Sequence, residues 1–207
     1  MSIASLSKFT VPLASDQSAT NQGLLMPKLK YRFRVSLENF GVSTPTTELT
    51  KQVADCSRPN VDFEMMTIDV YNSKVKLAGK HTWQDLKLTL RDDATGTVSK
   101  LVGEQLQKQF DFFEQASAAS GIDYKFTMRL EILDGGNGAF TPTVLETWEI
   151  LGAFVKSANY GDLGYSKNEP VTVELTISFD NALQSPTQAG VGANVGRTNG
   201  TLVTGGK

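Results

Sequence analysis

Regular alternation of apolar and polar residues is the feature that most constrains the fold of this 207-residue chain. In residues 29–37, 86–90 and 171–179 every second residue is apolar, and the residues between are charged or carry a hydroxyl group. Shorter runs of the same pattern occur at 126–132 and 144–150. A period of two gives a strand one apolar face and one polar face. The pattern therefore predicts a mainly β fold, an antiparallel β-sandwich or barrel.

One segment follows a different period. From residue 97 to 119 the apolar residues are spaced three and four apart, which predicts a flanking amphipathic helix ended by Gly121 as its C-cap. A glycine-rich segment, 135–138, predicts the turn of a hairpin with strands 125–133 and 143–154. The expected order is four strands, one helix and then three further strands.

The two ends of the chain differ from its centre in composition. Residues 1–28 are rich in Ser, Thr, Ala and Gln and predict an extended N-terminal arm, whereas 184–207 hold six glycines and predict a flexible C-terminal tail. Residues 29–183 form the predicted core domain. The arm has isolated apolar residues, and we expect these to contact a neighbouring subunit: Phe9, Val11 and Leu13.

The net charge is −2, from 20 basic and 22 acidic residues. The arm carries +1 and the tail +2, which leaves −5 on residues 29–183. This balance argues against a protein that binds nucleic acid tightly through a basic face. No apolar run reaches the roughly 18 residues of a membrane span, and the arm lacks the apolar run of a signal peptide. We therefore expect no membrane span and synthesis in the cytosol.

The sequence offers few residues for chemistry. The single histidine, His81, excludes a site with two imidazoles, and the single cysteine, Cys56, excludes an internal disulfide. Cys56 is either a thiolate activated by Arg58 or, as we favour, a small buried residue at a strand end. His81, beside Trp83, is interpreted as a surface or loop residue.

Two acidic motifs have structural interpretations as well as functional ones. The pair Asp92-Asp93 suits a general acid and base or a hard cation, but carboxylates just before a helix also stabilise its positive end. The segment 134–138 resembles part of a calcium loop but lacks the further carboxylates such a loop needs. Phosphate-binding and dinucleotide-binding glycine motifs are absent from the sequence. The chain is thus predicted to be no enzyme, with no catalytic residue, metal or cofactor.

A second predicted hairpin, with strands 61–71 and 74–79, points towards assembly. Methionine and tyrosine are common in interfaces, and a subunit or ring interface is predicted for one group of residues. These are Met65, Met66, Tyr71, Asn72, Ser73 and Lys74. The alternative places the two methionines in the barrel core.

The order of these segments resembles the tail tube protein of contractile-tailed bacteriophages. The similarity spans about 29–183 and begins with the strand 31–37 and the proline-terminated segment 51–59. It continues through the hairpin to the segment 76–93, which contains Leu-Ala-Gly-Lys-His-Thr-Trp before a strand with an acidic end and the helix. Residues 148–154 and 171–179 resemble the last strands of that family.

The resemblance implies a tail-tube-like β-barrel fold shared with the tube of type VI secretion systems. It also implies rings of six copies that stack into a tube inside a contractile sheath, through which the phage genome passes. The implied partners are the chain itself, the tail sheath protein, the baseplate and tail-terminator proteins, and double-stranded DNA that passes without specific binding. The implied location is the virion tail, assembled in the host bacterial cytoplasm.

Two alternative functions remain at this point. The first is a tube subunit of a tailocin or of a type VI-like secretion machine, which has the same fold. The second is a β-sandwich carbohydrate-binding module, which would expose aromatic platforms. Trp83 and Trp148 lie in or next to strand patterns and are predicted to belong to the core instead.

Overall fold

The computed structural model describes part of the chain, namely residues 28–42, 46–48, 51–134, 142–166, 168–185, 190–192, 195–198 and 201–204. Phe9, Val11, Leu13 and the predicted turn 135–138 lie outside the described residues. The chain divides into two units, residues 1–32 and 33–207. In the first unit, the backbone N–H of Arg32 donates to the carbonyl of Leu29, so the alternating pattern from residue 29 begins in a turn.

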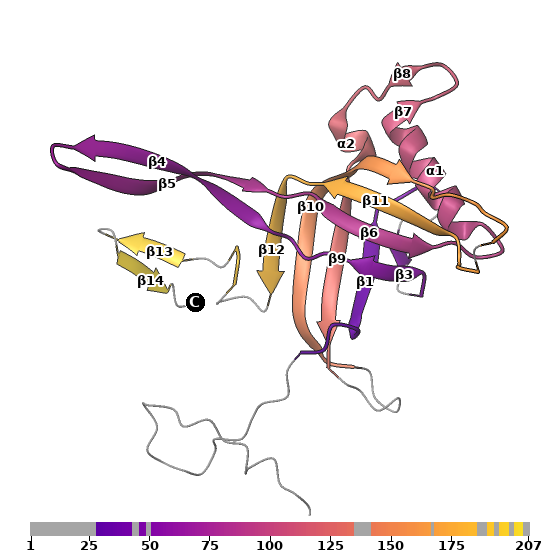
Figure 1. Ribbon diagram of the computed structural model, residues 1–207, viewed down its shortest axis with the longest axis horizontal. Coiled ribbons are helices and arrows are strands. Elements are labelled where there is room, and N and C mark those ends of the chain that lie inside the picture. Colours follow the sequence, from indigo (N-terminus) through magenta and orange to yellow (C-terminus); the bar gives the residue numbers. More distant parts are fainter. Residues whose placement is uncertain are drawn as a thin grey trace, which may run out of the picture. The chain divides into compact units, whose positions relative to one another are not determined.

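The second unit is built on an eight-stranded sheet in which every neighbouring pair is antiparallel (Figure 1). The strand order along the sheet is β2 (Thr46–Glu48), β1 (Phe33–Glu38), β9 (Phe126–Leu133), β10 (Val144–Asn159), β11 (Thr172–Ser178), β6 (Leu86–Arg91) and β3 (Val53–Cys56). The eighth strand, β12 (Asn181–Ser185), pairs with the first half of β10. The predicted mainly antiparallel β fold is confirmed.

Strand β10 belongs to two parts of this sheet. Its first half pairs with β9 and β12, and we call these strands, together with β1 and β2, sheet A. Its second half pairs with β11, and we call this strand, together with β6 and β3, sheet B. The pairing with β9 skips between Ile150 and Ala153, where Gly152 has a φ of 66°. The buried positions change there from even to odd numbers, because Trp148 and Ile150 point inward before the skip and Ala153 and Val155 after it.

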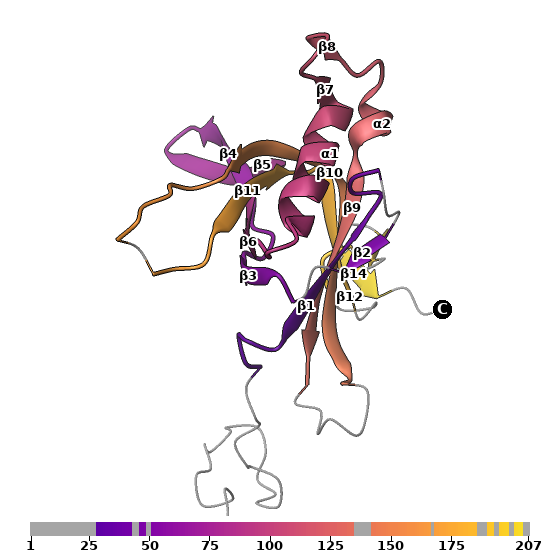
Figure 2. The same ribbon diagram turned by 90° about the vertical axis from the view of Figure 1, so that its right-hand side faces the viewer.

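The core consists of the apolar faces of both sheets and one face of α1 (Thr97–Gln109). Figure 2 shows α1 beside strand β10. In β1, β9, β11 and β6 the buried residues alternate with exposed or partly buried ones, as the sequence pattern predicts. Helix α1 contributes Val98, Leu101 and Val102, at the predicted helical spacing. Trp148 is buried and Trp83 packs against the core, as predicted for both tryptophans.

Helix α1 ends ten residues before the predicted end, and the prediction that it extends to residue 119 is wrong. The chain continues as β7 (Phe110–Asp111), β8 (Ala116–Ser117) and α2 (Gly121–Tyr124), so Gly121 begins a helix instead of capping one. The Asp111 carboxylate accepts hydrogen bonds from the backbone of Phe113 and Glu114, at 2.9 and 3.2 Å. These bonds compete with the helical ones and turn the chain.

Besides the short pair β7–β8, two hairpins of the described chain lie outside the eight-stranded sheet. Strands β4 (Val61–Val70) and β5 (Ser73–Trp83) form the predicted hairpin; β4 ends one residue before the predicted end, and β5 continues four residues beyond its predicted end. Strands β13 (Val195–Thr198) and β14 (Thr201–Thr204) pair within the region where the sequence predicts a flexible tail. No helix in the described residues is long and apolar enough to span a membrane.

Candidate assembly surfaces

The β4–β5 hairpin is a two-stranded ribbon (Figure 1). Both of its sides are exposed to solvent. Only Val61 and Trp83, which pair at its base, are partly buried among its strand residues. A two-stranded ribbon of this kind is at most marginally stable in water unless it packs against something. Apart from its base, the hairpin is not covered by any other element of the described chain.

The distal half of the ribbon is amphipathic. Cross-strand partners share a side, and Met66 faces Leu77 while Ile68 faces Val75, with Val70 next along the same side. We call these five residues the hairpin apolar face; each is between 43% and 51% exposed, so about half of each side chain remains in water. The opposite side pairs Thr67 with Lys76 and Asp69 with Lys74.

The predicted interface residues are all on this hairpin, but on different sides of it. Met65 and Met66 are 63% and 51% exposed, so the alternative that placed them in the core is wrong. Met66 belongs to the apolar face, whereas Met65 pairs with Ala78 on the opposite side.

The tip and the start of β5 hold the other predicted residues. Tyr71 is fully exposed and has a φ of 42°, a left-handed conformation that is costly for a residue with a side chain. Asn72 follows it in the two-residue loop, and Ser73 donates a hydrogen bond to the carbonyl of Val70 at 3.3 Å. Lys74 forms an exposed ion pair with Asp69 at 3.4 Å, which adds little stability.

The sequence interpretation missed four residues of the apolar face, namely Ile68, Val70, Val75 and Leu77. The alternation in 74–79 was visible, but which residues of the two strands share a side depends on the pairing register. That register places Val70 opposite Ser73 and leaves a two-residue loop, and a bulge near Gly79 shifts it towards the base.

The base of the hairpin is attached to the core through aromatic rings. Trp83 lies 5.6 Å from the buried Phe179, measured between ring centroids, and His81 lies 6.2 Å from Trp83. Phe63 continues the series at 6.3 Å from His81. The backbone N–H of Gln84 donates to the carbonyl of Asn60 at 2.9 Å, which closes the two strands at this end.

A second exposed apolar surface lies after α1, at residues 110–114, which we call the aromatic turn. Phe112 and Phe113 are 62% and 94% exposed, although the sequence predicted them on a helix. Asp111 accepts two backbone hydrogen bonds and one from the side chain of Gln107 at 2.7 Å. These bonds hold the pKa of Asp111 below its usual value, so the turn stays negatively charged.

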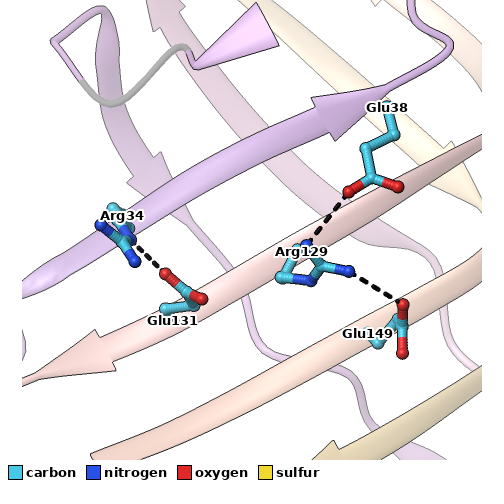
Figure 3. Close-up of polar contacts among 5 residues, drawn as sticks. All are labelled: Arg34, Glu38, Arg129, Glu131 and Glu149. Carbon is cyan, nitrogen blue, oxygen red and sulfur yellow. Dashed lines mark hydrogen bonds and ion pairs between the residues drawn. The ribbon is translucent and has the colours of Figure 1, made fainter. Parts of the chain in front are cut away.

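The outer side of sheet A, opposite the core, carries a row of ion pairs (Figure 3). Arg34 of β1 pairs with Glu131 directly opposite on β9. Arg129 of β9 contacts Glu38 at 3.0 Å and Glu149 of β10 at 3.2 Å. We call these five residues the charged face; its net charge is −1, and carboxylates contact both guanidinium groups.

The residues considered for chemistry are not brought together. His81 is exposed on β5, and Cys56 is the last residue of β3, where burial first and Asp55 second raise the pKa of its thiol to about 12. Such a thiol is no activated nucleophile. The described residues hold no group of three or more His, Cys, Asp or Glu side chains placed to bind a metal.

The acidic pair before α1 acts on the helix start. Asp93 accepts hydrogen bonds from the backbone N–H groups of Thr95 and Thr97, both at 3.1 Å, and from the Thr95 hydroxyl at 2.7 Å. The Thr95 hydroxyl first, and then the Thr97 backbone, lower the pKa of Asp93. Asp92 accepts from the hydroxyl of Ser99. These bonds support the structural interpretation of the pair.

The fold is shared with chains of contractile injection systems. A chain in the cryo-EM structure of the anti-feeding prophage (AFP) baseplate matches with a TM-score of 0.60 and 13% identity, over 78% of this chain and 97% of that one. A chain of the AFP tube terminating cap matches with a TM-score of 0.59 and 15% identity, over 82% and 97%. A chain of the PVC sheath-tube complex in the extended state gives 0.52 and 18%, over 77% and 91%.

These similarities concern the fold, since all three identities are below one fifth. No protein-family model matches the sequence, and no curated protein sequence matches it. The chain therefore has the tube-like fold expected from the sequence, an antiparallel β structure with a flanking helix. The hairpin apolar face, the aromatic turn and the charged face are candidate functional surfaces on this fold.

Proposed function

We propose that this chain is the structural subunit of a tail tube, which assembles into stacked rings inside a contractile sheath. The single observation that carries the proposal is the hairpin apolar face, exposed on a tube-like fold. Burying the exposed half of each of its five side chains would contribute about 1 kcal/mol per residue to association. A monomeric protein gains nothing from such a surface and is exposed to aggregation.

The finer features of the proposal are a ring of six copies, a role in genome delivery and a place in the virion tail. Its partners are then further copies, the sheath, and the baseplate and terminator proteins. The likeness to chains from sheath-tube, cap and baseplate structures supports this set of partners. The proposed role is structural and not enzymatic, and the raised pKa of Cys56 and the exposed position of His81 support it.

The charged face supports a conduit for a polyanion. Double-stranded DNA binds proteins mainly by replacing its counterions with free lysine and arginine side chains. Arg34 and Arg129 are both engaged by carboxylates, so a lumen lined by this face offers phosphate groups little attraction. We propose that the charged face lines the lumen.

A second candidate is the tube subunit of an injection particle that delivers cargo other than a genome. The similarity to chains of AFP and of an extracellular contractile injection system favours it. Tubes isolated from the producing cell distinguish the two functions. Nuclease-sensitive DNA in the lumen supports genome delivery, and protein cargo without DNA supports the injection particle.

The test of the main proposal is electron microscopy of the purified chain over a range of concentrations. Rings or tubes are expected, and six-fold averages would establish the ring size. A chain that lacks residues 70–75 should remain folded by circular dichroism but polymerise poorly. A protein that stays monomeric at every concentration, or a deletion that leaves tube growth unchanged, would contradict the proposal.

A further inference from the structure

The aromatic turn at 110–114 has no role in the function proposed so far. We propose that it is the surface on which the hairpin apolar face of a second copy of this chain docks. This inference rests on the proposed function, because it names the contact by which one subunit binds the next. Both surfaces are exposed within one copy, so neither covers the other there.

The aromatic turn has a fixed shape, which lowers the entropic cost of binding. The Asp111 carboxylate holds the backbone of Phe113 and Glu114, and Phe110 and Phe112 meet edge to face at 5.4 Å. Phe113 is 94% exposed and its ring is free to enter a contact. Rigid aromatic side chains presented in this manner are typical centres of protein interfaces.

The charges of the two surfaces are complementary. The aromatic turn carries −2, from Asp111 and Glu114, and the distal hairpin from residue 66 to 77 carries +1, from Lys74, Lys76 and Asp69. Within the described chain, Lys76 and the Glu114 carboxylate have no partner, whereas Lys74 pairs with Asp69. Both lysines lie on the side of the ribbon opposite the apolar face, so their charge acts at the rim of the contact and favours the encounter with the acidic turn of a second copy.

A second copy is the partner that these observations favour. Contact between two different surfaces of one kind of chain is heterologous, and repetition of such a contact generates rings or helical filaments. Each copy then supplies one hairpin and one aromatic turn, so every such surface inside the assembly is used. A competing surface is the loop that contains Leu163 and Tyr165, which are also exposed.

The test is disulfide cross-linking between engineered cysteines in a Cys56→Ser background. One variant carries Ile68→Cys on the apolar face and another carries Phe113→Cys in the aromatic turn. Mixed at concentrations that give assembly, they are expected to form mainly disulfide-linked heterodimers. The matched control is Thr67→Cys, one residue away on the opposite side of the ribbon, whose yield with Phe113→Cys should be several-fold lower.

Charge exchange provides a readout that does not depend on cysteine. Lys76→Glu should slow assembly, and more so at low than at high salt, because a charge at the rim of a contact acts mainly on the association rate. Adding Glu114→Lys to the same chain should restore the rate towards the original value. Monomer folding is checked by circular dichroism, because both side chains lie on the surface.

The outcomes separate the inference from the proposed function. Rings or tubes in which Ile68→Cys links to Leu163→Cys instead of Phe113→Cys would overturn the inference and leave the tube function standing. The same holds if the Thr67→Cys control cross-links equally well, or if Glu114→Lys brings no rescue. Failure of the unmodified chain to form rings or tubes would overturn both.

Discussion

Gly152 lies where β10 passes from sheet A to sheet B. Asp180 lies in the connection from β11 of sheet B to β12 of sheet A, and the two residues are in contact there. Gly152 has a φ of 66°, and a Cβ atom there would lie 2.2 Å from a carboxylate oxygen of Asp180. Asp180 is itself held by Lys125 at 2.5 Å. Any side chain larger than hydrogen at residue 152 therefore meets both strain and a steric clash.

Gly152→Ala is expected to lower the free energy of unfolding by about 2 to 4 kcal/mol, because a left-handed alanine costs about 1 to 2 kcal/mol and the Asp180 carboxylate must also move. Gly96→Ala is the matched control, since Gly96 has the same φ of 66° but nothing within 4 Å of its Cβ position. Urea denaturation of both variants measures the difference. Equal losses would show that the contact with Asp180 carries no cost.

Cys56 makes stability depend on pH in the alkaline range. The thiol has a pKa of about 12 in the folded chain, mainly through burial, and 9.0 is its ordinary value. Between these values the unfolded chain releases a proton that the folded chain keeps, so stability falls as pH rises. The contribution of this thiol to the free energy of unfolding is fully present below pH 9, falls as the pH rises, and is lost near pH 12.

Cys56→Ser is expected to reduce the fall in the free energy of unfolding between pH 8.5 and 10.5. Urea titrations at several pH values measure this fall in the two proteins. The thiol of the unmodified chain should also react with iodoacetamide much more slowly at pH 8.5 than after denaturation. A thiol equally reactive in both states would contradict the burial argument.

At the level of single elements, the hairpin gives the sharpest comparison between neighbouring residues. Ile68 lies on the apolar face and Thr67 on the opposite side, and both are exposed strand residues. Ile68→Asp is expected to abolish or greatly weaken assembly, because the charge must be desolvated in the contact. Thr67→Asp introduces the same charge at the adjacent position and should leave assembly much less affected.

Sedimentation velocity measures the assembled fraction of both variants, and thermal unfolding of the monomers shows whether they fold. The change in unfolding free energy should stay within about 1 kcal/mol for each, since surface substitutions usually cost little. If the two variants assemble equally well, the apolar face is not the contact.

The elements also show which parts of the structure follow from the sequence. Period-two patterns identified β1, β6, β9 and β11, because each strand buries one side in the same core. The start of α1 was equally clear. Its end was not, because the spacing of Phe110 and Phe113 continues a helical pattern that hydrogen bonds to Asp111 interrupt.

The register shift in β10 could not be predicted from the sequence, because it also depends on a contact between distant residues. The change of buried positions at Gly152 depends on the close approach of Asp180, which is 28 residues away in the sequence. The candidate surfaces likewise depend on details of the fold that the sequence pattern does not determine. The hairpin was predicted, but its apolar face required the register between two strands, and the aromatic turn required the true end of α1.

For the whole molecule, the charged face leads to a prediction about nucleic acid. Glu38 and Glu149 both contact Arg129, and replacing both by glutamine releases its guanidinium group. The variant with Glu38→Gln and Glu149→Gln is expected to retain double-stranded DNA more strongly than the unmodified chain. The gain should fall with salt, since each new phosphate contact adds about −0.9 to the slope of log K against log salt concentration.

Filter binding at several salt concentrations measures this gain for both the subunit and its assemblies. The matched control is the variant with Glu169→Gln and Glu174→Gln, which loses the same two charges where the described chain shows no ion pair. A gain of the same size in the control would mean that net charge, and not a released arginine, determines DNA retention.

The pairing of β1 with β9 also governs how the chain is made. Phe33 lies opposite Ile132, so this pair of strands cannot form during translation until about one hundred further residues have left the ribosome. The β4–β5 hairpin closes much earlier, because its strands are neighbours in the sequence. A nascent chain thus exposes the apolar face of this hairpin before its core has formed. Premature association has to be avoided on polysomes, where many such chains lie close together.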